Sequence, residues 1–167
     1  DWSMWGGTPS RNMVAEARGL PNDISSGKFL PKSETIDPKS TRNIRWIGKL
    51  GSQAYGSPVV SGGRVFVGTN NESPRDPAQT GDRGVLMCFD EKTGAFLWQL
   101  VIPKVGAGKV SDWEFVGLCS SATIEGDRGY VVTNRGEMVC FDVKGQADGN
   151  QGPFMDEAKF SSPDGKP

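Results

Sequence analysis

Short apolar runs separated by turn residues dominate the middle of the chain. Four such runs follow one another, at residues 53–60, 64–69, 84–89 and 95–100, and each is six to eight residues long. This length is typical of β-strands, and the Gly, Asn, Asp and Ser residues between the runs are typical of turns. The pattern therefore predicts a four-stranded antiparallel sheet whose strands are neighbours in the order of the sequence.

The same order of runs occurs a second time. Residues 118–124, 129–134 and 137–141 are again short and apolar, with a turn at 125–127. In the first unit, the run 85–89 (Val-Leu-Met-Cys-Phe) is apolar on both sides, whereas a strand with one face in water would alternate. We therefore expect each sheet to be covered on both faces.

Two pairs of markers share one spacing. The tripeptide Cys-Phe-Asp occurs at 88–90 and again at 140–142, and Trp46 precedes Trp98 by the same 52 residues. A repeat of this length indicates a propeller or a solenoid, and four strands per unit is the blade of a propeller. The predicted fold class is all-β, a β-propeller of four-stranded antiparallel blades.

The hairpin sequence CFDEKTGAFLW (88–98) resembles the tryptophan-docking motif of quinoprotein-type propellers, A-x-D-x-x-T-G-K-x-x-W. Cys88 stands for the small first residue, and Ala95 replaces the basic one. The resemblance implies that the tryptophan packs against the neighbouring blade. The second copy keeps only 140–142, because position 150 is Asn. The positions that match the motif are Asp90, Thr93, Gly94 and Trp98.

Four longer stretches, at residues 1–13, 50–71, 81–94 and 117–142, resemble exported PQQ-like repeat proteins of the planctomycete-type group. This resemblance implies an N-terminal portion of a ring, with about one complete blade and one incomplete blade. Propellers contain roughly four to eight blades. The expected partners are therefore the remaining blades, from the same polypeptide or from a second chain.

The expected division of the chain follows from this resemblance. We expect residues 43–50 to be the outer strand that closes the last blade and to pair with a strand outside this sequence. We expect the N-terminal segment to wrap over the outside of the ring, and a binding arm is the alternative. The divisions are the extended wrap (1–42), the closing strand (43–50), a first blade (51–100), a second blade lacking its outer strand (101–145) and a loop segment (146–167).

The composition removes several classes of function. Lys and Arg together number 19 and Asp and Glu 20, so no net charge favours nucleic acid, and we expect no nucleic-acid partner. No run of about 18 apolar residues occurs, so we expect no transmembrane segment. Histidine is absent, which excludes His-containing zinc sites and triads with a His base within this sequence.

Two features bear on the cellular compartment. The sequence begins at Asp1 without an initiator Met, which we interpret as a processed, exported protein of the periplasm or cell envelope. A trimmed or proteolysed chain is the alternative. The three cysteines, Cys88, Cys119 and Cys140, would be too far apart in the predicted blades for a disulfide. We expect all three to be unpaired, buried and poorly reactive.

The longest predicted loops, residues 70–83 and 101–116, open on one rim of the propeller together with the turn 134–136. Elaborate loops on one face of a scaffold usually carry function. Their carboxylates and amides lack the spacing of a preformed calcium loop, so solvated charge is the simpler interpretation. Trp113 is either a stacking platform for a planar ring or a plug at the channel mouth. The candidate ligand residues are Asn70, Asn71, Glu72, Asp82, Asp112, Trp113, Asn134 and Arg135.

Two functions of different classes fit this sequence. The first is a binding or scaffold propeller, resembling the outer-membrane assembly lipoprotein that shares these repeats without a cofactor. The second is a quinoprotein dehydrogenase, in which pyrroloquinoline quinone (PQQ) sits at the channel with calcium and an Asp base removes a proton from an alcohol. The adjacent cysteine pair of many such enzymes is absent, since Ser120 follows Cys119.

No catalytic residue, cofactor ligand or metal ligand is identified in this sequence. We therefore expect a binding protein and predict no cofactor. Enzyme activity stays an open alternative, because the residues of a PQQ- and calcium-dependent site would lie in the other blades.

Overall fold

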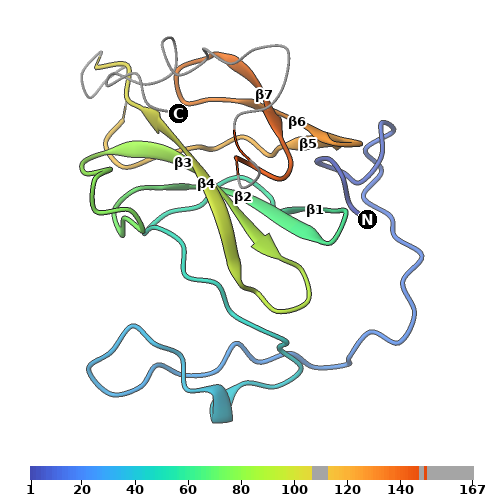
Figure 1. Cartoon of the computed structure of the whole chain (residues 1–167). Coiled ribbons are helices and arrows are strands. Elements are labelled where there is room, and N and C mark those ends of the chain that lie inside the picture. The colour runs from blue at the N-terminus through green and yellow to red at the C-terminus, as the bar shows by residue number, and fades with distance from the viewer. Residues whose placement is uncertain (107–112, 147–148, 150–167) are drawn as a thin grey trace.

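The computed structural model describes residues 1–106, 113–146 and 149. In this part of the chain, seven strands form two antiparallel sheets, and the 3-10 helix η1 (Pro38–Ser40) is the helical element. The predicted all-β class and the predicted order of the strands are confirmed. The first sheet contains β1 (Val59–Ser61), β2 (Arg64–Asn70), β3 (Arg83–Asp90) and β4 (Phe96–Pro103), and the second contains β5 (Thr123–Glu125), β6 (Arg128–Val132) and β7 (Met138–Asp142) (Figure 1).

No helix among the described residues is long and apolar enough to span a bilayer.

The first strand of each sheet is shorter than the sequence predicts. In the first sheet, β1 begins only at Val59, directly after Pro58, which has no N–H to donate to a ladder. In the second sheet, the segment before β5 reaches across to the first sheet. There the Leu118 N–H donates to the carbonyl of Thr69 in β2 (3.1 Å). The segments that enter the two sheets are therefore connections rather than paired strands.

The register of the strands defines equivalent positions in the two sheets. Phe66 pairs with Cys88 in the first sheet, and Tyr130 pairs with Cys140 in the second. Phe66 and Tyr130 are 64 residues apart, whereas Cys88 and Cys140 are 52 apart. The first unit therefore has 12 more residues than the second between its second and third strands. This insertion is the long β2–β3 loop.

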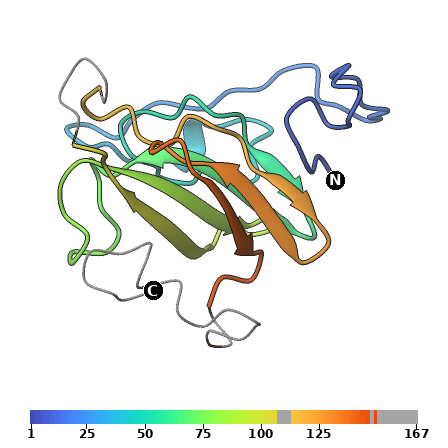
Figure 2. The same ribbon diagram turned by 90° about the horizontal axis from the view of Figure 1, so that it is seen from above.

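Apolar side chains fill the space between the sheets. The second sheet lies against one face of the first, so that the two form consecutive layers (Figure 2). Phe66 lies near the middle of this core, with its ring centroid 5.9 Å from that of Trp98 and 6.0 Å from that of Phe141. The buried residues of the core are Val59, Phe66, Leu86, Cys88, Ile102, Leu118, Ala122, Ile124, Val131 and Val143.

The other face of the first sheet is covered by a different segment. Trp46 and Leu50 pack against a second apolar cluster formed by Val67, Val85, Met87 and Phe89. Residues 43–50 form no strand within the described part of the chain. Trp46 and Leu50 cover the face of the first sheet that points away from the second sheet. The pairing of residues 43–50 with a strand outside this sequence stays a prediction.

Trp46 and Trp98 make equivalent contacts. The Trp98 indole Nε1–H donates to the Val143 carbonyl (3.1 Å), and its ring centroid lies 5.7 Å from that of Phe141. The Trp46 indole donates to the Glu91 carbonyl (2.8 Å), and its ring lies 6.2 Å from that of Phe89. Each tryptophan therefore reaches the third strand and the following turn of the next unit.

Glycine is required beneath both tryptophans. Gly94 has φ +73°, and a Cβ at this position would come within 2.5 Å of the Trp46 ring. Gly145 has φ +67°, and a Cβ there would come within 2.7 Å of the Trp98 ring. Asp90 shapes the first of these turns by accepting bonds from the N–H (2.8 Å) and hydroxyl (2.7 Å) of Thr93, and these bonds lower the pKa of its carboxyl.

The three cysteines are free, as expected, but only Cys88 is buried. The expectation that all three are buried is wrong for Cys119 and Cys140, which are exposed. Cys140 lies on β7, the edge strand of the second sheet, on the face that has no further sheet against it among the described residues. Cys119 lies in the irregular segment before β5.

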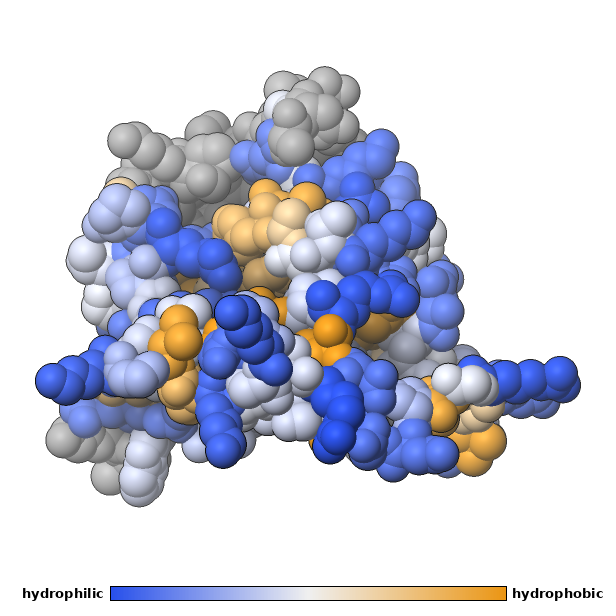
Figure 3. All heavy atoms as spheres, turned by 90° about the horizontal axis from the view of Figure 1, so that it is seen from below, coloured by the Kyte–Doolittle hydropathy of each residue, from blue (hydrophilic) through white to orange (hydrophobic). Residues whose placement is uncertain are grey.

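The N-terminal segment divides into two parts. Residues 2 and 3 lie beside the sheets, where Trp2 pairs with Val60 of β1. The following residues run away from the sheets before the chain returns at residues 43–50 (Figure 1). Figure 3 shows exposed apolar groups between polar ones on the lower face of the molecule. The large apolar residues of the N-terminal segment that are exposed are Trp5, Met13, Val14, Leu20, Ile24, Phe29 and Leu30. The expected wrap of residues 1–42 over the outside of a complete ring stays a prediction.

Candidate functional site

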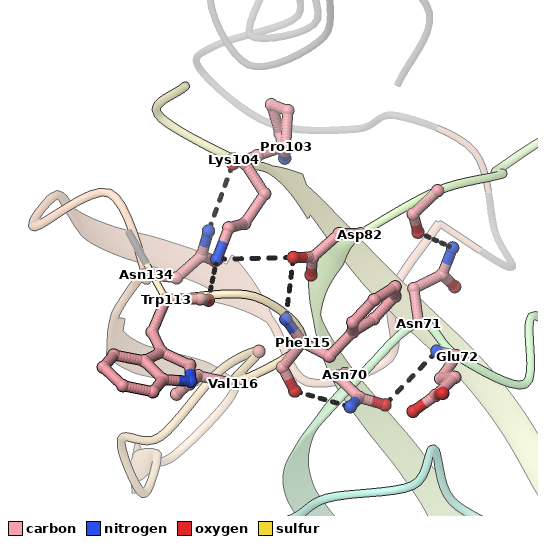
Figure 4. A network of polar contacts seen from close by, with 12 residues as sticks. Asn70, Asn71, Glu72, Asp82, Pro103, Lys104, Trp113, Phe115, Val116 and Asn134 are labelled. Carbon is pink, nitrogen blue, oxygen red and sulfur yellow. Dashed lines mark hydrogen bonds and ion pairs between the residues drawn. The ribbon is translucent and has the colours of Figure 1, made fainter. Parts of the chain in front are cut away.

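Loops from both sheets meet on one rim of the molecule. Asp82, at the end of the β2–β3 loop, accepts a hydrogen bond from the backbone N–H of Phe115 in the β4–β5 connection (2.7 Å). The Lys104 ammonium lies 3.6 Å from the same carboxylate oxygen and also donates to the Trp113 carbonyl (2.6 Å). Figure 4 shows the Asp82 and Lys104 side chains pointing toward one another, with the backbone groups of Trp113 and Phe115 beside them. The predicted grouping of loops is thus present in the described residues.

Asn70 holds this rim together from beneath. Its side chain is fully buried, and its Oδ1 accepts bonds from the N–H groups of Ser52 (3.0 Å) and Glu72 (3.2 Å). Its amide nitrogen donates to the Ser52 hydroxyl (2.9 Å) and to the Phe115 carbonyl (2.6 Å). An amide side chain has two donors and two acceptor positions, so the capacity of Asn70 is used completely. Asn70 therefore positions the loops.

Asn71 has a similar role within its own loop. It is also buried, and its amide nitrogen donates to the carbonyls of Gln79 and Gly81, which closes the loop on itself. Glu72 is exposed, and its carboxylate accepts a bond from the Ser52 hydroxyl. Of these neighbouring candidates, Glu72 is the one whose side chain reaches solvent.

Asn134 occupies the position in the second sheet that Asn70 occupies in the first, 64 residues later. Its amide nitrogen donates to the Pro103 carbonyl (3.1 Å), but its Oδ1 is buried without a partner among the described residues. Gly84 lies directly against this oxygen, since a Cβ there would approach it to 2.0 Å. Asn134 therefore ties the second sheet to β4 with part of its hydrogen-bonding capacity unused.

The remaining candidates differ in accessibility. Trp113 is 71 % exposed beside the Asp82 contact. Arg135 is held at the rim by both carboxylate oxygens of Glu137 (3.1 and 3.2 Å) and by the Lys104 carbonyl (3.3 Å). Asp112 lies outside the described residues. The role of these residues in binding a ligand stays a prediction.

Sequence reasoning missed the role of Phe115 at the rim. The backbone of Phe115 accepts from Asn70 and donates to Asp82, but a backbone contact leaves no signal in the residue type. Asn70 and Asn134 did carry a signal, because each directly follows a threonine at the end of the second strand of its unit. Such repetition in both units indicates a structural role.

Arg75 is a second residue that the sequence did not single out. Its guanidinium lies 4.5 Å from the ring centroid of Phe96 and 5.4 Å from that of Phe89. It also donates to the Lys49 carbonyl (2.6 Å), so the β2–β3 loop is fastened to the segment that covers the first sheet. An open pocket beside this contact is lined by Lys49, Ser73, Pro74 and Arg75.

Comparison with known proteins identifies the family. The model of the PQQ-like repeat family that is described as "Outer membrane protein assembly factor BamB" matches residues 36–147. The comparison with curated proteins found no match. The matched range covers both sheets and the segment that precedes them, which is well over half of the chain. The chain therefore belongs to the PQQ-like repeat family, and its two sheets are blades of a partial β-propeller.

Proposed function

We propose that this chain forms part of an exported binding or scaffold propeller that holds a protein partner on the rim of the β2–β3 loop, the β4–β5 connection and the β6–β7 turn. The contact between Asp82 and Phe115 carries this proposal, because it joins loops of both blades into one surface. The residues that this contact joins need not be ordered when a partner binds, which saves conformational entropy. Trp113 supplies an exposed aromatic side chain of the kind enriched in binding hot spots.

The family supports the class of partner and the compartment. Its description names outer membrane protein assembly, which favours a protein partner in the cell envelope. We assign the chain to the periplasm or cell envelope on the same ground. The remaining blades of the ring, from the same polypeptide or a second chain, are further partners, because two blades are fewer than the roughly four that a closed propeller needs.

The two tryptophans support the assignment of these blade contacts. We propose that Trp46 and Trp98 are docking residues that lock each blade onto the next. Their equivalent indole hydrogen bonds, to Glu91 and Val143, favour this role. By the same equivalence, residues 43–50 would be the outer strand of the blade that precedes the first.

A PQQ- and calcium-dependent dehydrogenase is the alternative function. Within the described residues, no three Asp, Glu, Cys or His side chains gather into a possible metal site. Asp82 lies beside the Lys104 ammonium, whose positive charge opposes a cation at this carboxylate. The described residues of these two blades thus offer no cluster of carboxylates for calcium. In the alternative, the ligands of the enzyme would lie in other blades.

Site-specific photo-crosslinking in the source cells tests the proposed rim. A photoreactive amino acid in place of Trp113 is expected to crosslink a protein partner. The matched control replaces Lys92, an exposed residue of the β3–β4 turn, and is expected to give no such product. Crosslinks that form only from position 92 would contradict the rim as the binding surface.

An absorption spectrum separates the binding protein from the enzyme. Full-length protein would be isolated intact from its source, and its spectrum and calcium content would be measured together. The proposal expects no quinone chromophore. A quinone recovered in about equal amount to the protein, together with calcium, would overturn it in favour of the dehydrogenase.

A further inference from the structure

The two blades have free edges that face the same side. β1 and β5 are the first strands of their sheets, each bonded on one side only, and they contact each other. In β1, Val59 and Ser61 flank Val60 and pair with β2. Backbone groups alternate in direction along an antiparallel strand, so those of Val60 point away from β2 toward the free edge. Unpaired edges of this kind accept additional strands.

The N-terminal segment occupies both free edges. The Trp2 N–H donates to the Val60 carbonyl (2.6 Å), and the Val60 N–H donates to the Trp2 carbonyl (3.0 Å). One residue further, the carbonyl of Ser3 accepts from the N–H of Ile124 in β5 (2.7 Å). Two consecutive residues therefore bridge the two blades. Figures 1 and 2 both show the N-terminus beside the ends of these sheets.

Local structure holds this segment in place. Gly7 has φ +81°, and a Cβ at this position would come within 2.7 Å of the Trp2 ring, so the indole lies directly on the glycine. The Gly7 N–H donates to the Met4 carbonyl (2.9 Å), which closes a turn. The Arg11 guanidinium then lies 5.7 Å from the centroid of Trp5. The first eleven residues thus fold back on themselves next to the edge that they occupy.

We propose that β1 and β5 form a binding site for an extended peptide backbone and that residues 1–11 are its intramolecular occupant. The site recognises main-chain groups, as in strand addition to a sheet edge, and the Trp2 ring on Gly7 sets the register. The N-terminal segment joins the two blades at the edges formed by their first strands, β1 and β5. It uses no residue of the proposed rim, so this site is independent of the proposed partner surface.

Hydrogen exchange in the full-length protein tests this site. Gly7→Ala places a methyl group against the Trp2 ring, and the matched control is Gly19→Ala, a glycine of similar φ (+68°) with no atom within 4 Å of its Cβ. In the unaltered protein, the amides of Val60 and Ile124 should be protected. In Gly7→Ala they should exchange about tenfold faster or more, while Gly19→Ala and the amides of β3 stay unchanged.

A deletion keeps the test decisive if Gly7→Ala unfolds. In a variant from which only residues 1–8 have been deleted, the amides of Val60 and Ile124 should lose their protection from hydrogen exchange. A synthetic peptide of residues 1–11 should restore it, and the same peptide with Gly7→Ala should not. Equal protection of the two amides with and without the segment would overturn the proposal, as would failure of the unaltered peptide to restore it.

Discussion

The two blades share strand order and register, yet equivalent residues lie in very different surroundings. Cys88 is completely buried, whereas its equivalent, Cys140, is exposed. Phe66 is buried and its equivalent, Tyr130, is only partly buried. The pairing of the strands is the same in both blades, so pairing does not account for the difference. The neighbouring layers account for the difference in burial. Among the described residues, the first blade is covered on both faces, whereas the second blade is covered on one face.

The apolar face of a blade is therefore buried by the next blade and not by the blade's own strands. The exposed face of the second blade carries Val132 and Met138, the latter 75 % exposed, beside Cys140. Apolar side chains on a sheet face favour burial at about 25 cal/mol per Å² of apolar surface. Equivalent substitutions in the two blades should thus have unequal effects, and the following predictions test this.

The largest difference is expected between Phe66→Ala and Tyr130→Ala. Removing the buried Phe66 ring leaves a cavity between the blades and should lower the free energy of unfolding by about 3–5 kcal/mol. Tyr130 is partly exposed on the open face, so its removal should cost about 1 kcal/mol. Urea denaturation of the two variants and the unaltered protein measures both values. Equal losses of stability would show that the open face of the second blade is as well covered as the equivalent face of the first blade.

A smaller difference is expected between Asn70→Ala and Asn134→Ala. Asn70 uses its whole capacity, and its loss would leave the Ser52 and Phe115 backbone groups unpaired, at a cost of about 2–3 kcal/mol. Asn134 makes one such bond and has one buried acceptor without a partner among the described residues. Its removal eliminates that unpaired oxygen too, so we expect about 1 kcal/mol or less. A larger loss for Asn134→Ala, again from urea denaturation, would contradict this order.

The sequence predicted the features that depend on repetition and on continuous apolar pattern. The strands β2, β3, β6 and β7 lie where apolar runs were found, and the 52-residue spacing placed Cys88 and Cys140 at equivalent positions. The lengths of the first strands were less predictable, because a run such as 53–60 is as apolar as a strand and yet pairs only after Pro58.

The candidate site was predicted at the level of loops and less well at the level of side chains. Asn70 is a polar residue at the end of a strand, and such a residue resembles a ligand in the sequence. Its burial depends on the distant backbone of Phe115, 45 residues away, which no local pattern reveals. The contact of Trp2 with Val60 escaped prediction for the same reason, since backbone groups of any two residues can form it.

The smallest expected difference concerns the thiol of Cys88 and depends on pH. Burial raises the pKa of this thiol from its ordinary value of 9.0 to about 12. Below the lower value, the thiol is protonated in both the folded and the unfolded chain and adds no pH dependence. Above it, the unfolded chain releases this proton and the folded chain keeps it, so this group makes the protein less stable as pH rises toward 12.

The substitution Cys88→Ala removes this pH dependence. Between about pH 8 and about pH 10, the stability advantage of the unaltered protein over Cys88→Ala should therefore shrink by about 1–1.5 kcal/mol. Urea denaturation of both proteins under reducing conditions measures this advantage, and a constant value across that range would show that water reaches the thiol between the two blades.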